Sequence, residues 1–525
     1  MAKNFPVVEV RLETIVGGGQ ALGQLEDGRK FFVWGGLPGE LVRAQITKRK
    51  SSYAEGKVVE VLEASEERVA PRNPGSYLST SPWQIMKAEA EQHYKAALIE
   101  EAFELHDIVL PNPIDVYTDG QRYHYRNKLE FSWFGHEQDG KETLDLAFFV
   151  RGSKGKVAVD EMSLARPEII RTALQVRDLL RKKHITARNL KSLLVRADQK
   201  GNVVWQLYIK DEIQNIISDD EANAIPAQGG EVIYSDPKSP ASKITKRLRS
   251  FGDIVLSDSV MGVDFHYATE GFFQINLPVY EAALVEMKQW VKPLNPASPP
   301  PQSAETASRS TSVEYASAEA PAADVSEGWV AERSSSNLND ALAAQLSEPF
   351  LQETKSEEQP DTFLPAAKNV PARNGLLKKT VPGDERVKVL DLYSGVGTIG
   401  LTIGGNDVTL VEIDEHAVRE MKRNIEFLKS DAKAVLAASE NALEYITAEA
   451  TIIVDPPRAG LHEAVVQRLL KVKPPRIIYL SCNPVTQARD VARLAEAYGI
   501  RSHHGYNFFP CTPHIEHLVI LDLKP

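Results

Sequence analysis

A cysteine lies where a thiol could act as a nucleophile. Cys482 belongs to the stretch Ser481-Cys482-Asn483-Pro484, which directly follows the apolar run 476–480. The run predicts a buried strand, and Asn483-Pro484 predicts the start of a helix. Open α/β sheets carry their chemistry at the carboxyl ends of parallel strands, and a helix N-terminus favours the reactive thiolate. A lone cysteine is more often a small buried hydrophobic residue, so the neighbouring motifs have to decide between the two interpretations.

A glycine-rich loop predicts a nucleotide site. The stretch Asp391-Leu392-Tyr393-Ser394-Gly395-Val396-Gly397-Thr398-Ile399-Gly400 follows a predicted strand and leads into a predicted helix, and its glycines match G-x-G-x-x-G. Glu412 ends the next predicted strand and could accept hydrogen bonds from a ribose diol, with Asp414 as the competing candidate. NAD(P) and S-adenosylmethionine both fit this pattern, and a tight turn without a ligand is the alternative. Asp391 favours a cofactor with a cationic amino-acid group, because an acid there would repel phosphates.

A second acidic residue follows a predicted strand at the same edge of the sheet. Asp455 opens the turn Asp455-Pro456-Pro457-Arg458-Ala459-Gly460. Two consecutive prolines make this turn irregular, so we expect it to project Asp455 toward the cleft. A turn residue without a functional role is the alternative.

Alternating strands and helices must position these residues. From about residue 386 the sequence alternates between continuous apolar runs, typical of buried parallel strands, and amphipathic stretches. Seven strands with interleaved helices predict a doubly wound α/β sheet. The predicted strands are 387–393, 408–413, 434–438, 451–454, 476–480, 501–508 and 517–523.

The preceding part of the chain predicts a small barrel and a mixed α/β region. Short strands separated by turn signals in 6–63, at 7–10, 30–34, 41–46 and 56–62, indicate an OB-like barrel. Residues 64–262 predict a helix at 88–105 and strands at 128–134 and 203–209. A basic cluster with Tyr53 in the barrel suits a phosphate backbone or is a solvated charged face, and composition leaves both open. The basic residues are Arg43, Lys48, Arg49, Lys50 and Lys57.

The acidic balance of the chain is concentrated in one segment. Residues 293–370 hold 12 acidic and 4 basic residues, whereas the whole chain has a net charge of −11. With sparse aromatic residues, this segment predicts a disordered acidic insertion at about 293–385. The two cysteines indicate a reducing compartment, and neither an N-terminal apolar segment nor a membrane-spanning run is found. We therefore expect a cytoplasmic protein without membrane contact.

In combination, the motifs resemble those of the S-adenosylmethionine-dependent RNA uracil-C5 methyltransferases, which make 5-methyluridine in ribosomal or transfer RNA. The N-terminal residues, with Leu37-Pro38-Gly39-Glu40, look like the TRAM barrel that ribosomal members carry and short transfer-RNA members lack. Tyr125-Arg126-Asn127-Lys128 looks like the middle domain of the family. Besides the glycine-rich loop, the matching motifs are Gly271-Phe272-Phe273-Gln274-Ile275-Asn276, Asp455 to Gly460, Ser481-Cys482-Asn483-Pro484-Val485-Thr486 and Phe509-Pro510-Cys511-Thr512-Pro513-His514-Ile515-Glu516-His517.

The resemblance implies a role for each candidate site residue. Cys482 would be the nucleophile that adds to C6 of uracil, and Glu516 the general base that removes the C5 proton. The remaining implied residues would hold S-adenosylmethionine or order the site, and no metal is implied. They are Gln274, Tyr393, Glu412 and Asp455.

The resemblance also implies the architecture and the partners. A class I methyltransferase domain at 263–525, with seven strands of which the last is antiparallel, would follow a TRAM-like barrel at 1–65 and a mixed α/β middle domain at 66–262. Both preceding domains would bind RNA, the protein would be a monomer, and the TRAM-like barrel favours 23S ribosomal RNA over transfer RNA as substrate.

The sequence departs from the family at two places. Cys511 stands where the family usually has histidine, and residues 65–165 lack the four cysteines that hold an iron–sulfur cluster in some relatives, so no cluster is predicted. The acidic residue that contacts adenine, expected near Glu440-Asn441, is not placed.

Three other functions compete with this interpretation. A Rossmann oxidoreductase would explain the glycine-rich loop but would leave Cys482 and Glu516 unused. A 5-methylcytosine enzyme would typically carry a Pro-Cys motif after the fourth strand, where this chain has Asp455-Pro456-Pro457. A non-catalytic RNA-binding protein on the same fold is the third alternative.

Overall fold

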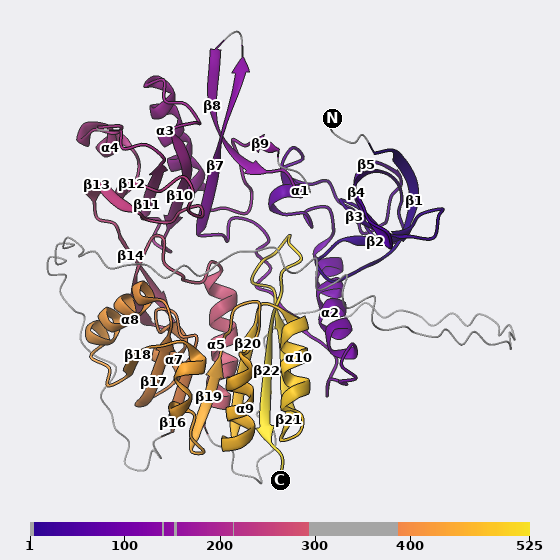
Figure 1. Ribbon diagram of the computed structural model, residues 1–525, viewed down its shortest axis with the longest axis vertical. Coiled ribbons are helices and arrows are strands. Elements are labelled where there is room, and N and C mark those ends of the chain that lie inside the picture. The colour runs from indigo at the N-terminus through magenta and orange to yellow at the C-terminus, as the bar shows by residue number, and fades with distance from the viewer. Residues whose placement is uncertain (1–4, 139–140, 152–154, 214, 293–386) are drawn as a thin grey trace, which may run out of the picture. The chain divides into compact units, whose positions relative to one another are not determined.

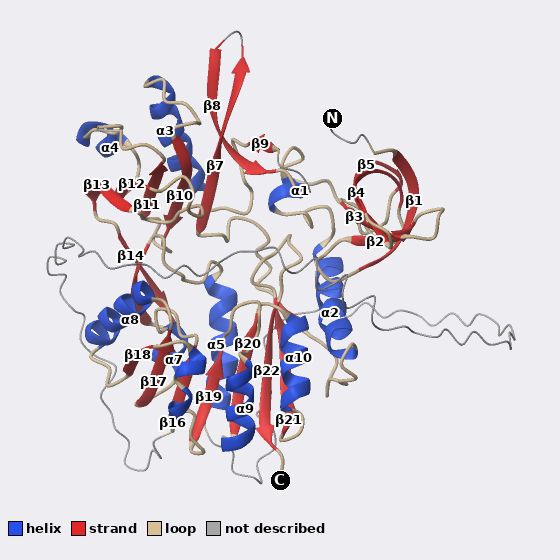
Figure 2. Ribbon diagram, in the orientation of Figure 1, coloured by secondary structure: helices blue, strands red, loops and turns tan. Residues whose placement is uncertain are grey.

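A computed structural model gives the fold and describes residues 5–138, 141–151, 155–213, 215–292 and 387–525. The acidic insertion predicted at about 293–385 lies outside these residues. The described chain forms a closed five-stranded barrel, a seven-stranded sheet, a two-stranded hairpin and an eight-stranded sheet (Figures 1 and 2). None of the helices in the described ranges is both long and apolar enough to cross a membrane.

The predicted N-terminal barrel is confirmed. Its strands follow the order β1-β2-β3-β5-β4 and close through antiparallel pairing of β1 with β4. Alternating side chains such as Val10, Leu12 and Val42 fill the interior, as the period of two in a strand requires. The prediction missed β2, because Gly23 interrupts the alternation where a Cβ atom would come within 2.6 Å of the Arg11 carbonyl oxygen. The strands are β1 (Val7–Ile15), β2 (Ala21–Gln24), β3 (Lys30–Trp34), β4 (Leu41–Arg49) and β5 (Tyr53–Glu63).

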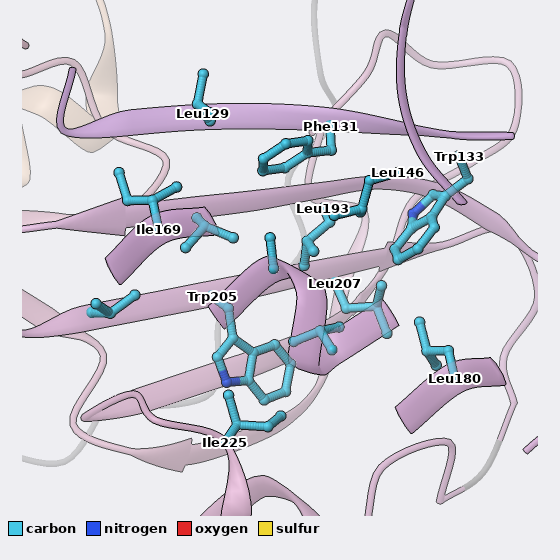
Figure 3. Packing of buried hydrophobic residues seen from close by; sticks show 14 of the residues in the cluster. Leu129, Phe131, Trp133, Leu146, Ile169, Leu180, Leu193, Trp205, Leu207 and Ile225 are labelled. Atoms are coloured by element: carbon cyan, nitrogen blue, oxygen red, sulfur yellow. The ribbon is translucent and has the colours of Figure 1, made fainter. Parts of the chain in front are cut away.

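The middle sheet has seven strands in the order β13-β12-β11-β10-β7-β8-β9. One amphipathic helix, α3 (Pro167–Lys182), covers a face of this sheet and buries Ile169 and Leu180 against the strands. Figure 3 shows Trp133 and Trp205 in the same apolar cluster. The strands are β7 (Lys128–Gln138), β8 (Lys141–Phe149), β9 (Lys156–Ala158), β10 (Leu190–Ala197), β11 (Val203–Ile209), β12 (Gly229–Tyr234) and β13 (Lys246–Gly252), and α4 (Asp219–Ala224) lies between β11 and β12 in sequence.

The C-terminal sheet contains all seven predicted strands in the order β18-β17-β16-β19-β20-β22-β21, with the short strand β6 added at the edge. Strands β16 to β20 are parallel to one another, and β22 is antiparallel to both β20 and β21. The doubly wound sheet is therefore confirmed, including its antiparallel last strand. The strands are β6 (Val116–Tyr117), β16 (Lys388–Leu392), β17 (Asp407–Glu412), β18 (Lys433–Leu436), β19 (Ala450–Val454), β20 (Arg476–Ser481), β21 (Tyr498–Tyr506) and β22 (Glu516–Leu523).

Successive strand residues of this sheet pack into two separate cores. Val389 faces a core with α5, α7, α8 and the hairpin of β14 and β15, whereas the next residue, Leu390, faces a core with α2, α9 and α10. Burial on both faces explains the continuous apolar runs in the sequence. The covering elements are α2 (Ala88–Glu104), β14 (Val255–Val260), β15 (Val263–Ala268), α5 (Leu277–Val291), α7 (Thr398–Ile403), α8 (Glu415–Leu428), α9 (Glu463–Val472) and α10 (Pro484–Leu494), with the short helices α1 (Tyr77–Thr80), η1 (Ser439–Asn441) and η2 (Leu443–Tyr445) elsewhere.

Two segments of the predicted middle domain join the C-terminal sheet. Helix α2, predicted at 88–105, buries Ile99 and Phe103 in one of its cores, and β6 pairs in parallel with β21. Helix α2 also lies beside α10, the helix that starts after Cys482 (Figure 1). The boundaries of the three predicted domains stay a prediction, but the C-terminal sheet packs against and pairs with residues from before residue 120.

Candidate active site

Cys482 lies where the sequence predicts it, between a strand and a helix. Cys482 directly follows β20, and helix α10 begins at Pro484 with Asn483 as its N-cap. The Asn483 side-chain oxygen accepts a hydrogen bond from the Val485 N–H at 3.3 Å. A proline at the first helical position and an asparagine cap are typical of helix starts. The thiol is therefore fixed between a buried strand and the first turn of a helix.

The turn that carries Asp455 is attached to the same helix start. Asn483 Nδ2 donates to the Arg458 carbonyl oxygen at 2.9 Å, and Thr486 Oγ1 donates to the same oxygen at 3.0 Å. These bonds hold the turn after β19 against the turn after β20. Asp455 and Arg458 therefore lie at the same edge of the sheet as Cys482, as the sequence predicts for the ends of parallel strands.

Glu516 lies beside Cys482 because the last strand, β22, is antiparallel to β20. It is the first residue of β22, is 4% exposed, and precedes His517, which pairs with Ser481 on β20. The next position in this register places Glu516 beside Cys482. Residues 34 positions apart in the sequence thus meet at one end of the sheet.

The charges of the site suppress ionisation of the thiol. Burial, with the carboxylates of Glu516 and Asp455, raises the pKa of Cys482 from 9.0 to about 12, and the Arg458 guanidinium opposes this shift. The helix N-terminus favours the thiolate, but desolvation and two nearby acids act in the opposite direction.

The carboxyl groups of Glu516 and Asp455 influence each other. Burial and the negative charge of Asp455 raise the pKa of Glu516 well above its usual value, while Arg458 lowers it. Burial also raises the pKa of Asp455. Two acids that share a buried site oppose each other's ionisation, so a charge on one carboxyl disfavours a charge on the other.

The glycine-rich loop has the geometry of a ligand-binding turn. Gly395 and Gly397 have φ angles of 55° and 88°, in the left-handed region that favours glycine. A Cβ atom at Gly400 would lie 2.3 Å from Leu410 Cδ2, so a side chain there would separate α7 from β17. Tyr393 also has a positive φ of 63°, which is strained for a residue with a side chain. The loop is held in a conformation that most sequences would avoid.

Of the two acidic candidates after β17, Glu412 lies at the loop and Asp414 has another task. Glu412 Oε2 accepts from the Gly395 N–H at 2.9 Å, which ties the loop to the end of β17. Asp414 is the N-cap of α8 and accepts from the Ala417 N–H at 2.7 Å. Of the two acids, Glu412 is therefore the one that lies at the glycine-rich loop.

A pocket of ≈ 330 Å³, counted to its open mouth, lies between the glycine-rich loop and the 271–276 motif. Phe272 is 65% exposed, whereas Phe273 is buried and stacks on Tyr267 with ring centroids 4.2 Å apart. Of these two phenylalanines, Phe272 is therefore the one that offers a free aromatic face. The predicted residues Gln274, Tyr393 and Asp455 line the pocket together with Phe272, Gly395 and Tyr280.

Asp391 has a different role from the one predicted. It is fully buried, and its Oδ2 accepts from the Gly400 N–H at 2.9 Å. It does not line the pocket, and burial raises its pKa to about 8. The carboxyl group thus fixes the glycine-rich loop from beneath, and the expectation that it selects a cationic cofactor is not supported by its position.

Three residues with a place at the site were not singled out by the sequence. Tyr280 lines the pocket from α5, where its apolar neighbours predict only core packing. His514 Nδ1 lies 3.3 Å from Arg458 Nη2, and burial lowers the pKa of His514 to about 3, so its ring is neutral. Ser439 Oγ lies 2.8 Å from Tyr393 Oη and 3.2 Å from Glu440 Oε2. The acidic stretch expected near the adenine is therefore beside Tyr393.

Cys511 is a packing residue. It is fully buried, its N–H donates to Glu91 Oε1 at 2.9 Å, and its thiol donates to the Arg122 carbonyl oxygen at 3.7 Å. Burial raises the pKa of Cys511 to about 12. The residue fixes the loop before Glu516.

The predicted basic cluster of the barrel is largely paired with acids. Arg43 bonds Glu9 and Glu60 at 2.9 Å each, and Lys48 bonds Glu55 at 2.7 Å. These pairs favour a solvated charged face at Arg43 and Lys48. Within the described ranges, no group of three or more histidine, cysteine and acidic side chains is arranged to hold a metal ion.

Comparisons with known proteins extend this picture. The family model for tRNA (uracil-5-)-methyltransferase matches residues 379–524, and the TRAM domain model matches residues 2–59. A protein of Nitratidesulfovibrio vulgaris named as an uncharacterized RNA methyltransferase is 23% identical over 534 residues, which cover 99% of this chain and 97% of the relative. The tRNA (uracil(54)-C(5))-methyltransferase of Pyrococcus abyssi is 41% identical over 143 residues, 27% of this chain and 34% of that protein.

The fold has a solved counterpart over its full length. The crystal structure of the Pyrococcus abyssi tRNA (uracil-54, C5)-methyltransferase in complex with S-adenosyl-L-homocysteine superposes with a TM-score of 0.64 and 19% identity, covering 98% of this chain and 100% of that chain. The names of the relatives indicate an RNA methyltransferase. The chain thus joins a TRAM domain to a tRNA (uracil-5-)-methyltransferase domain on a class I methyltransferase fold, and it fits the family of RNA uracil-C5 methyltransferases.

Proposed function

We propose that the protein transfers a methyl group from S-adenosylmethionine to C5 of a uridine in RNA, giving 5-methyluridine. The observation that carries this proposal is the pairing of β20 with β22, which places a thiol, Cys482, beside a buried carboxyl, Glu516. A nucleophile and a base at one sheet end, next to a pocket lined by the glycine-rich loop, are what methylation of a poorly nucleophilic carbon requires.

The pocket fits S-adenosylmethionine. Gly395 lines it without a side chain, Glu412 is held at the loop, and Gln274 and Tyr393 offer an amide and an aromatic face. Asp455 adds a carboxyl group that suits a cationic ligand and disfavours the pyrophosphate of NAD(P). The cofactor would supply an electrophilic methyl group on a positively charged sulfur. We infer that these four residues, Gln274, Tyr393, Glu412 and Asp455, hold it or order the pocket.

Cys482 would make C5 nucleophilic. Its thiolate forms a bond to C6 of uracil, and the C5–C6 π electrons move toward O4 to give an enolate whose C5 can take a methyl group. Because its thiol is protonated in the free protein, Cys482 must lose the proton when the substrate binds. Arg458 is the cation whose charge favours the thiolate, so it would stabilise this step.

Glu516 would complete the reaction. After methyl transfer its carboxylate takes the proton from C5, the electrons of that C–H bond restore the C5–C6 double bond, and the C6–S bond breaks to release Cys482. A pKa raised by burial makes Glu516 a stronger base than an exposed glutamate. Phe272, exposed at the pocket, is a candidate surface for stacking a base that has left its helix or loop.

Ribosomal and transfer RNA are both candidate substrates. The barrel led us to expect 23S ribosomal RNA, and that expectation is retained as a proposal. The second candidate is favoured by the 41% identical stretch of a transfer-RNA enzyme, and a transfer-RNA enzyme also shares the full-length fold. A barrel on this fold therefore does not discriminate between the two RNA classes.

The remaining assignments follow from this proposal. We propose a monomer that acts in the cytoplasm without an iron–sulfur cluster, and RNA contacts from the barrel and the middle domain. A non-catalytic RNA-binding protein on this fold is disfavoured, because Cys482, Glu516 and the pocket-lining residues are all in place.

Labelled methyl transfer tests the proposal. The purified protein would be incubated with methyl-labelled S-adenosylmethionine and with separated ribosomal and transfer RNA from cells lacking the enzyme, and the labelled nucleoside identified after digestion. We expect label in 5-methyluridine, in one RNA class. Label in 5-methylcytidine would refute the base chemistry, and absence of label with intact cofactor binding would favour the RNA-binding alternative. Cys482→Ala is the control and should bind cofactor without transferring methyl.

A further inference from the structure

The motif Tyr125-Arg126-Asn127-Lys128 contacts the loops that carry the pocket and the base. Asn127 Nδ2 donates to the Gln274 carbonyl oxygen at 3.0 Å, and Lys128 Nζ donates to the Glu270 carbonyl oxygen at 2.9 Å. Tyr125 Oη donates to the Pro510 carbonyl oxygen at 3.0 Å, in the loop before Glu516. The start of β7 in the middle sheet thus bonds segments on both sides of the site.

A second cation from the neighbouring strand reaches the same segment. Arg196 lies opposite Lys128 in the pairing of β10 with β7. Its Nη1 donates to the Gly271 carbonyl oxygen and its Nη2 to the Phe273 carbonyl oxygen, each at 2.7 Å. The guanidinium is fully buried and lies 4.5 Å from the ring centroid of Tyr267. Two adjacent strand ends therefore hold the backbone of residues 270–274.

Burying these two cations costs free energy that filling a core does not require. Burial lowers the pKa of Lys128 to about 7 and also lowers the pKa of Arg196. Buried cations cost free energy that an apolar pair of the same size would avoid. Their hydrogen bonds go to the loop whose side chains, Phe272 and Gln274, line the pocket.

We propose that Asn127, Lys128 and Arg196 are positioning residues that fix residues 270–274, so that Phe272 and Gln274 face the cofactor pocket. The middle sheet then shapes the cofactor site without touching the cofactor, since none of the three residues lines the pocket. This inference rests on the proposed function, because it assigns the pocket to S-adenosylmethionine.

Binding of S-adenosylhomocysteine to Lys128→Met tests the proposal. The substitution keeps the length of the side chain and removes the donor. We expect about tenfold weaker binding by calorimetry, the effect of losing one charged hydrogen bond in the loop. Lys156→Met is the matched control, because Lys156 Nζ donates to the Trp133 carbonyl oxygen at 2.9 Å in the same sheet and does not line the pocket. It should bind as the unchanged protein does.

Hydrogen exchange of the backbone gives a readout that needs no ligand. In Lys128→Met the amides of 271–276 should exchange faster, while Lys156→Met leaves them unchanged. Arg196→Lys keeps a charge but loses the two-pronged bond, so it should show an intermediate exchange rate and affinity. If Lys128 had only a structural role, both lysine variants would have equally lowered melting temperatures. The amides of 271–276 would then exchange only through global unfolding of the protein.

These measurements distinguish a failure of the proposed function from a failure of the positioning role. If the unchanged protein binds no S-adenosylhomocysteine, the proposed function fails and the positioning role falls with it. If it binds and Lys128→Met binds equally well with unchanged exchange, the positioning role alone is overturned. If Lys128→Met does not fold, Asn127→Ala decides in the same assays, because it removes only the bond to the Gln274 carbonyl oxygen.

Discussion

The protonated state of Cys482 leads to a quantitative prediction. Burial and the two neighbouring carboxylates raise its pKa from 9.0 to about 12, which reduces the thiolate population about 10³-fold at neutral pH. Thiolate nucleophilicity rises with pKa, with a Brønsted coefficient of about 0.4–0.5, and recovers part of this loss. We therefore expect iodoacetamide to alkylate Cys482 about 30- to 60-fold more slowly than the same cysteine in the denatured chain.

Changing the neighbouring charges should move this rate in opposite directions. Glu516→Gln removes one of the groups that raise the thiol pKa, so Cys482 should react faster although the base is lost. Arg458→Met removes the charge that favours the thiolate, so the reaction should slow further.

Mass spectrometry of the alkylated peptides between pH 6 and 11 gives both rates. Cys511, fully buried, should stay unmodified in the folded protein and serves as an internal reference. Cys482→Ala identifies any signal from elsewhere. An inflection at pH 9 or below in the unchanged protein, or slower alkylation in Glu516→Gln, would refute the reasoning that carboxylates control the thiol.

Three further perturbations follow from the same geometry. Glu516→Gln, incubated with cofactor and RNA, should accumulate a covalent RNA–protein adduct on denaturing gels, because addition and methyl transfer survive while elimination stalls; a folded variant without adduct contradicts the role of Glu516. The pKa of Asp391 is raised from 3.8 to about 8, so the folded state binds this proton more tightly and stability falls as pH rises between these values, by at most about 1.4 kcal/mol per pH unit. Asp391→Asn should flatten that slope in urea unfolding at pH 5 and 7, and equal slopes would show that the carboxyl is not the cause. Arg43→Ala should leave the log–log slope of RNA affinity against salt unchanged, because its guanidinium is already paired with carboxylates; a slope smaller by about 0.7–0.9 would place a phosphate on this face.

Local sequence patterns were sufficient to predict that the candidate site residues lie at strand ends. Apolar runs ended by Glu412, Asp455 and Cys482 identify strand ends, and parallel strands bring such ends to one edge. The antiparallel last strand, implied only by resemblance, is what brings Glu516 to Cys482. Periodicity alone does not fix the direction of a strand.

Properties that depend on non-local packing were not predictable in this way. Asp391 stands in the loop motif, but the strand turns its side chain inward to bond the Gly400 N–H. The contacts of Lys128 and Arg196 join segments more than 70 residues apart, which no local pattern encodes. A charged residue in a motif can thus bind the backbone of the site through hydrogen bonds instead of contacting a ligand.

In the proposed reaction, Cys482 becomes reactive only after the RNA substrate has bound. A helix start alone would favour a thiolate, yet the antiparallel strand adds Glu516 at the next register position, and its charge opposes ionisation. In the proposed reaction the proton of Cys482 would pass to Asp455, which leaves the Glu516 carboxylate free to take the C5 proton after methyl transfer. The free protein would then keep an unreactive thiol, and substrate binding would generate the nucleophile. The alkylation rates of Cys482 in the unchanged protein and in Glu516→Gln decide this, because a thiolate present before substrate binding would react at the ordinary rate.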